Sequence, residues 1–117
     1  ETDKWSKDAD LPYLSGRAGV TLSDGTVVTL GGMGLVDRVA AYDADVLVRR
    51  GTAFIAVEAA AMPPGRCFPT LAAAPDGSVI MFGGYRRVDG EPQERLGDVW
   101  RLELRPAPPR TTTPPYD

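Results

Sequence analysis

The chain has 117 residues, of which 43% are hydrophobic and 25% charged, a composition typical of one small globular domain. The net charge is −3 and both signs are mixed along the chain, so we expect no nucleic-acid partner; no apolar stretch is long enough for a transmembrane segment. The chain has no histidine and a single cysteine, Cys67, which removes the commonest catalytic base, any disulfide within the chain and any metal site built on thiolates.

Thirteen glycines and eleven prolines indicate many turns, and therefore short strands rather than long helices. In chain order, the first candidate strand covers about residues 4–7 around Trp5. The next four candidates form one unit. Asp24-Gly25, between two β-prone runs, predicts a two-residue hairpin turn with positive φ at both positions. We expect the strands of this unit, a to d, at residues 17–22, 26–30, 39–43 and 53–57.

The alanine-rich run at residues 53–62 leaves a helix open as the alternative, because alanine is the best helix former. The run is short, however, and lies between Gly51-Thr52 and Pro63-Pro64. We therefore favour a strand there.

The same unit occurs a second time. Gly16-Arg17 returns as Gly65-Arg66, a spacing of 49 residues, and Gly31-Gly32 returns as Gly83-Gly84, a spacing of 52. An insertion of three residues near 72–75 would account for the difference. The second copy contributes strands at residues 78–82 and 98–104, after a first strand that follows Arg66. Trp5 lies 11 residues before Gly16, as Phe54 lies before Gly65, so residues 1–10 are expected to hold the last strand of a preceding unit.

These features resemble the kelch repeat, whose pattern is a Gly-Arg opening, a hairpin, hydrophobic residues ending in a glycine pair, and later aromatic residues. The alternative is an ordinary antiparallel meander. The resemblance implies an all-β fold of antiparallel four-stranded propeller blades. It covers residues 1–104, with repeats at 15–58 and 64–104, and residues 105–117 form an extended Pro/Thr-rich tail. The residues that carry the repeat motif are Trp5, Gly16, Arg17, Gly31, Gly32, Gly65, Arg66, Gly83, Gly84 and Trp100.

Propellers have 4 to 8 blades, whereas this chain supplies about two, the second without its fourth strand, and so makes an incomplete ring. We therefore expect a non-catalytic protein-interaction or scaffolding module that is a subunit or linker of a larger complex, or a homo-oligomer, and that needs no cofactor. The alternative is a fragment of a kelch-containing enzyme, an oxidase or lyase, whose catalytic residues lie outside the chain. A third possibility is a carbohydrate-binding module with exposed Tyr85 and Tyr116. The sequence indicates no compartment.

The segment after the second glycine pair, residues 85–95, is the candidate partner-binding loop. It is longer than its expected counterpart at 33–38, and it combines an aromatic residue with arginines, which are enriched at interface hot spots. The expected anchors are Tyr85, Arg86, Arg87 and Arg95; a solvated insertion is the alternative.

Other candidate groups have plainer interpretations. Cys67 could be a thiol activated by Arg66, but a small packed residue on the first strand is favoured. Loop carboxylates could form an acid–base pair or bind a cation, although they lack the spacing of a calcium loop. These carboxylates are Asp37, Asp43, Asp45, Glu91 and Glu94. Arg17 and Arg66 are expected to donate hydrogen bonds to backbone carbonyls, since a buried guanidinium must be satisfied.

Overall fold

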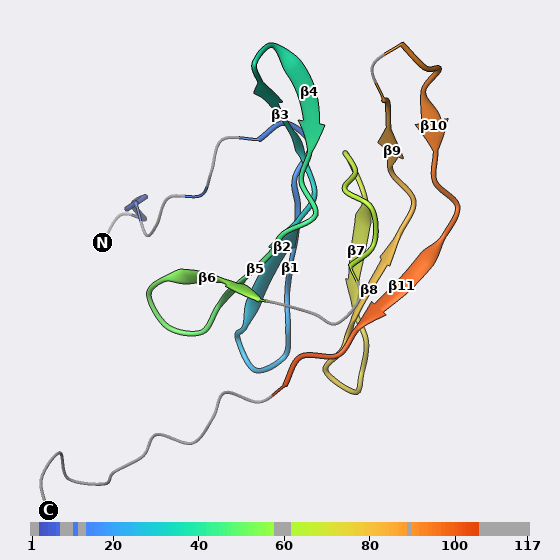
Figure 1. The fold of residues 1–117 in the computed structure, drawn as a ribbon. Coiled ribbons are helices and arrows are strands. Elements are labelled where there is room, and N and C mark those ends of the chain that lie inside the picture. Colours follow the sequence, from blue (N-terminus) through green and yellow to red (C-terminus); the bar gives the residue numbers. More distant parts are fainter. Residues whose placement is uncertain (1–2, 8–10, 12–13, 58–61, 89, 106–117) are drawn as a thin grey trace, which may run out of the picture.

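A computed structural model describes residues 3–7, 11, 14–57, 62–88 and 90–105 (Figure 1). The regular secondary structure of these described residues consists of strands alone, and all strand pairs are antiparallel. This confirms the expected all-β class. The same part holds no helix long and apolar enough to cross a membrane.

The first sheet has four strands in the order β1-β2-β5-β6. Its strands are β1 (Ala18–Thr21), β2 (Val27–Leu30), β5 (Val46–Arg49) and β6 (Phe54–Val57). Strand β6 settles the choice for residues 53–57 in favour of a strand. The prediction for the third strand is wrong: residues 39–43 do not enter this sheet, and β5 occupies the place beside β2. In β5, side chains alternate between the two faces of the sheet, so the buried Val46 and Val48 both point to the face that packs into the core. The strand at 39–42 has no buried side chain and does not fit this place.

The second sheet has three strands in the order β11-β8-β7. These are β7 (Thr70–Ala73), β8 (Val79–Phe82) and β11 (Val99–Leu102). The sheets lie side by side in Figure 1, and β1 contacts β7. The described residues make neither a fourth strand for this sheet nor a closed ring. Residues 3–7, expected to hold a strand, form none, and the Trp5 side chain is fully exposed.

Two hairpins extend from the same end of the sheets (Figure 1). One consists of β3 (Met33–Val36) and β4 (Val39–Tyr42), and the other of β9 (Tyr85–Arg86) and β10 (Glu94–Arg95). The turn between β3 and β4 is formed by Asp37 and Arg38, which both have positive φ, 49° and 66°. This is the conformation of a two-residue type I′ turn, which the sequence predicts at Asp24-Gly25 instead.

At Asp24-Gly25 only the glycine has positive φ, 90°. The amide of Leu22 donates to the carbonyl of Thr26, and the amide of Gly25 donates to the carbonyl of Leu22. This makes a three-residue hairpin loop that ends in a left-handed glycine. The carboxylate of Asp24 accepts a hydrogen bond from the Thr26 amide, which suits an aspartate to this position.

The repeat is structurally regular through its first three strands. Strands β1, β2 and β3 begin at residues 18, 27 and 33, and β7, β8 and β9 begin at 70, 79 and 85, so one constant offset relates the two copies. The left-handed Gly16 corresponds to the left-handed Phe68 at the same offset. The insertion expected near residues 72–75 is therefore absent. The Gly-Arg pairs are closer together than the glycine pairs because Arg66 lies earlier in its copy than Arg17 does.

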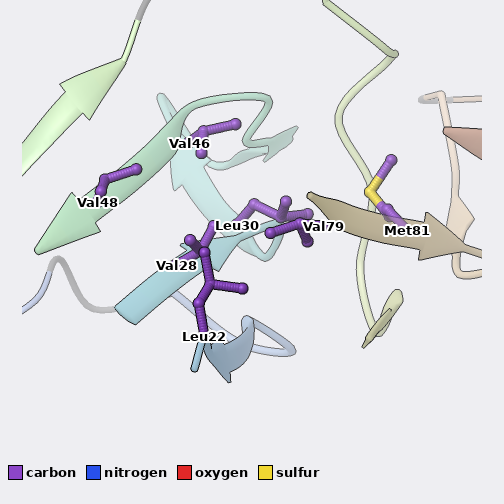
Figure 2. Packing of buried hydrophobic residues seen from close by; sticks show 7 residues of the cluster. All are labelled: Leu22, Val28, Leu30, Val46, Val48, Val79 and Met81. Carbon is purple, nitrogen blue, oxygen red and sulfur yellow. The ribbon is translucent and has the colours of Figure 1, made fainter. Parts of the chain in front are cut away.

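The core lies between the two sheets (Figure 2). Seven buried residues form it, with side chains from β2 and β5 facing side chains from β8; Figure 2 shows Leu30 close to Val79. Trp100 and Leu102 of β11 pack against this cluster. The seven residues are Leu22, Val28, Leu30, Val46, Val48, Val79 and Met81. Burial of this apolar face fixes the two sheets against each other, and thereby places both hairpins at one end.

Candidate functional site

Each glycine pair is held by a buried arginine. The Arg17 Nη1 atom donates to the Gly31 carbonyl at 3.0 Å and to an Asp43 carboxylate oxygen at 2.9 Å. The Arg66 Nη1 atom donates to the Gly83 carbonyl at 3.1 Å, and its guanidinium contacts both carboxylate oxygens of Asp98. The hydrogen bonds to carbonyls expected from the sequence are thus confirmed for both arginines. Two arginines at unequal positions in their repeats perform the same task, because the long side chain reaches the same backbone carbonyl from either place.

Asp98 is the most strongly perturbed acid in the described part of the chain. Hydrogen bonds from the Arg66 guanidinium and from the Trp100 indole, at 2.6 Å, hold the pKa of the Asp98 carboxyl far below its usual range. The Arg66 side chain is only 1% exposed, whereas the Asp98 side chain is 36% exposed. The three side chains tie the second glycine pair to β11, so they stabilise the base of the β9–β10 hairpin. Trp100 is thereby part of this hydrogen-bonded support.

Position 65 is a glycine because the backbone of another strand packs closely against it. A Cβ atom on Gly65 would collide with the carbonyl of Tyr42 at the end of β4. The carbonyl of the next residue, Arg66, accepts a hydrogen bond from the Gly32 amide at 2.7 Å. The start of the second repeat therefore lies against the base of the β3–β4 hairpin.

The β3–β4 hairpin is apolar on both faces. Outside the turn its strands read Met-Gly-Leu-Val and Val-Ala-Ala-Tyr. Leu35 is 72% exposed, Val36 62% and Val39 47%. An isolated two-stranded hairpin is marginally stable in water, and exposed apolar residues grouped on one element are typical of an interaction surface. The sequence patterns did not indicate this surface, because they place Leu35 and Val36 in a loop at 33–38 and Val39 in a strand of the first sheet at 39–43.

The β9–β10 hairpin carries the four anchors expected from the sequence, and the structure divides them. Tyr85 is half-buried, exchanges backbone hydrogen bonds with Cys67 and stacks on Phe68 with ring centroids 5.8 Å apart, so it belongs to the support of the hairpin. Arg95 lies opposite Tyr85 in the register and is exposed.

The other two anchors also differ from each other. Arg86 is half-buried, and its buried Nε atom has no hydrogen-bond partner among the described residues. Arg87 is exposed and donates to the carbonyl of Glu91 at 3.0 Å. Only Arg87 and Arg95 are therefore fully available on the surface of this hairpin.

The expected difference in loop length is wrong. The connection from the glycine pair to the next strand of the sheet covers positions 33–45 in the first repeat and 85–98 in the second, so the two are almost equally long. The two hairpins are therefore counterparts that differ in chemistry. One is apolar and the other is charged, and the pair makes an end surface with an apolar part beside a polar part.

Two of the remaining candidate groups, Cys67 and Asp43, have structural roles. Cys67 lies before β7 rather than on it, is buried, and directs its thiol to the carbonyl of Ser15 at 3.3 Å. Burial raises the pKa of the Cys67 thiol, which contradicts a thiol activated by Arg66 and agrees with a packed residue. Asp43 is used by Arg17, and the described residues bring no three potential metal ligands together.

An apolar cavity lies between the sheets and is lined by residues that include Leu30, Met81 and Trp100. Its volume of about 60 Å³ is well below the several hundred cubic ångströms of a usual ligand pocket. The end surface with its two hairpins is therefore the better candidate site.

No protein-family model, curated protein or solved structure matches the chain. The candidate site thus depends on the residues and geometry described above. Residues 106–117, which include most of the expected tail and Tyr116, lie outside the described residues.

Proposed function

We propose that the chain is a non-catalytic, kelch-type protein-interaction module that acts as part of a larger assembly and binds its partner through the two hairpins. The observation that carries the proposal is the apolar, exposed β3–β4 hairpin, with Leu35, Val36 and Val39 on its surface. In the buried centre of an interface such residues supply the hydrophobic free energy of association.

The charged β9–β10 hairpin provides the rim of this surface. Arg87 and Arg95 are exposed there, beside the acidic Glu94. Rim charges contribute mainly to the rate and specificity of association, whereas a buried apolar anchor contributes most of the affinity. We therefore place the main anchors on β3–β4 and assign the arginines a secondary role.

The backbone supports this use of the hairpins. Both are held at their base by a buried guanidinium, through Arg17 in the first repeat and Arg66 in the second. A rigid base reduces the conformational entropy that the hairpin loses on binding, which favours affinity. The incomplete second sheet, with Phe82 43% and Val99 69% exposed on its outer face, also favours a chain that functions next to other protein surface.

The experiment uses a photo-crosslinking amino acid at position 35, in the full chain, in extract from the native source. The matched control places it at position 55, because Ile55 is 66% exposed on β6, away from the hairpins (Figure 1). We expect a discrete adduct from position 35 that is lost on Val39→Lys and is absent from position 55. Equal labelling from both positions, or an adduct indifferent to Val39→Lys, would contradict the proposal.

Arg87→Ala/Arg95→Ala tests the rim separately. We expect a weaker complex, with a decrease smaller than that caused by Val39→Lys, and an unchanged melting temperature. If the double arginine variant abolishes the adduct while Val39→Lys leaves it intact, the arginines are the anchors and the apolar hairpin is not.

A further inference from the structure

The second sheet ends in an unpaired edge among the described residues. Strand β11 pairs with β8 on one side, and no described strand pairs on its other side. In the first sheet the corresponding strand, β5, is covered by β6 along its whole length. An open edge presents unpaired backbone amides and carbonyls, which favour the addition of another strand.

The residues that follow β11 in this sequence are poor candidates to cover it. Residues 106–117 contain five prolines, which have no amide hydrogen to donate to a strand partner. An occupant must therefore be sought elsewhere, and the sequence of the edge itself indicates which one.

Strand β11 and the residues after it read Val-Trp-Arg-Leu-Glu-Leu from residue 99 to residue 104. The alternating apolar side chains, Trp100, Leu102 and Leu104, pack on the core side. Arg101 and Glu103 lie on the opposite, solvent-exposed side. The segment thus carries one positive and one negative side chain on the same face, two residues apart.

This spacing is self-complementary when two copies pair in antiparallel fashion. With Leu102 opposite Leu102 of the second copy, Arg101 lies opposite Glu103 and Trp100 lies opposite Leu104, in both halves of the pair. Opposite charges that face each other across two strands are stabilising, and like charges are destabilising. A two-fold axis normal to the sheet keeps each side chain on its own face. The axis therefore passes between two copies of the same residue, and each alternative register is defined by which residue of the segment lies at the axis.

The neighbouring registers are less favourable. An axis at Arg101 places the two arginines opposite each other, and an axis at Glu103 places the two glutamates opposite each other. An axis at Leu104 restores an opposite charge pair, between Glu103 and Arg105, but it sets Leu102 against Pro106, which cannot donate a backbone hydrogen bond. Of these four registers, only the Leu102-centred one sets opposite charges against each other and also pairs Trp100 with Leu104, while Val99 lies opposite Arg105 at each end.

We propose that β11 is a homodimerisation edge, at which a second copy of the chain pairs antiparallel about Leu102 and extends the three-stranded sheet to six strands. This interface is separate from the hairpins of the proposed function. Variants at Leu35 or Val39 are therefore expected to leave the dimer unchanged, and the two proposals fail independently.

The first test is sedimentation equilibrium of the full chain with charge-reversed variants. Glu103→Arg replaces two attractive pairs with two repulsive ones, so we expect the dimer Kd to rise on the order of tenfold or more. Arg101→Glu is expected to do the same, although it also removes the Arg101 hydrogen bonds to Asp76 and Ser78. The double variant Arg101→Glu/Glu103→Arg restores complementarity and is expected to return the Kd close to its original value.

The second test locates the axis. In the proposed register the two residues at position 102 are directly opposite, roughly 5 Å apart, a distance that a disulfide can bridge. Residues at position 103 would be displaced by two positions, about 8 Å apart, beyond that range. Under mild oxidation Leu102→Cys should form a covalent dimer and Glu103→Cys should not, with the unmodified chain as the control for the buried Cys67.

Three results of these experiments would overturn the proposed homodimer. A chain that stays monomeric overturns the proposal, including the case in which another polypeptide covers the edge. A dimer that ignores both charge reversals, or in which the double variant fails to recover, overturns it as well. Circular dichroism and melting of each variant establish that its fold is retained, and Glu103→Arg leaves the Arg101 network in place.

Discussion

The replacement Arg66→Met is the most informative single substitution in the fold. The Arg66 side chain is 1% exposed and donates to the carbonyls of Pro64 and Gly83 and to the carboxylate of Asp98. Methionine retains much of the apolar stem, so the variant mainly removes the charged hydrogen bonds. The Gly83 carbonyl then lacks this donor, and the Asp98 carboxylate loses its counter-ion.

The magnitude follows from burial. Breaking a fully buried ion pair costs about 3–5 kcal/mol, but Asp98 is 36% exposed and water can solvate it in the variant. We therefore expect a loss of about 2–4 kcal/mol in the free energy of unfolding, a large share of the stability of a small domain. Urea unfolding followed by circular dichroism measures it as a lower midpoint with an unchanged slope.

Arg101→Met is the matched control, because Arg101 forms an ion pair with Asp76 of the β7–β8 turn while both side chains are largely exposed. Both variants are unfolded at a protein concentration well below the dimer Kd, so that the place of Arg101 at the proposed dimer edge does not affect the midpoint. Exposed pairs contribute about 0–1 kcal/mol, so this variant should unfold close to the original midpoint. Equal destabilisation by the two substitutions would refute the reasoning, because burial would then not be what makes Arg66 important.

Three further predictions concern acid, packing and turn strain. The pKa of Asp98 is lower in the folded than in the unfolded chain, so the stability that Asp98 contributes is complete above the unfolded pKa, about 4, and is lost as pH falls toward the folded pKa. Asp98→Asn should therefore reduce the loss of unfolding free energy between about pH 5 and 2. An unaltered pH profile of stability would count against this role of Asp98. Gly65→Ala should lower the melting temperature strongly because its Cβ would meet the Tyr42 carbonyl, whereas Gly97→Ala, with nothing nearby, should be close to neutral; similar melting curves would contradict this. Arg38→Gly should raise the free energy of unfolding by up to about 1 kcal/mol by relieving a positive φ, and a decrease would show that the turn is not strained.

Local patterns predicted most of the strands but misplaced the repeat. Residues 26–30 and 78–82 carry β-branched runs that end in glycine pairs, and both became strands, β2 and β8. The shorter spacing between the Gly-Arg pairs was misleading, because a side chain as long as arginine can reach the same carbonyl from two backbone positions. Only the three-dimensional contacts reveal that Arg66 and Arg17 serve equivalent places.

The candidate site was harder to predict than the fold. Asp37-Arg38 lacks the glycine or asparagine that marks a type I′ turn, so the β3–β4 hairpin was not expected and its exposed apolar residues were missed. Tyr85 is predicted to be a binding anchor because aromatic residues and arginines are enriched at interface hot spots. In the structure Tyr85 stacks on Phe68, which has a left-handed φ of 53° that sequence patterns do not indicate.

The mass of the native particle tests the central claim most directly, namely that the chain works as an interaction module within a larger assembly. The chain alone has a mass of 12.5 kDa. Native mass spectrometry of the protein from its source should give a larger particle that contains a different polypeptide, and Val39→Lys should release the chain from it while Ile55→Lys does not. A particle that contains only this chain, or a mixed particle that persists in the Val39→Lys variant, would contradict the claim.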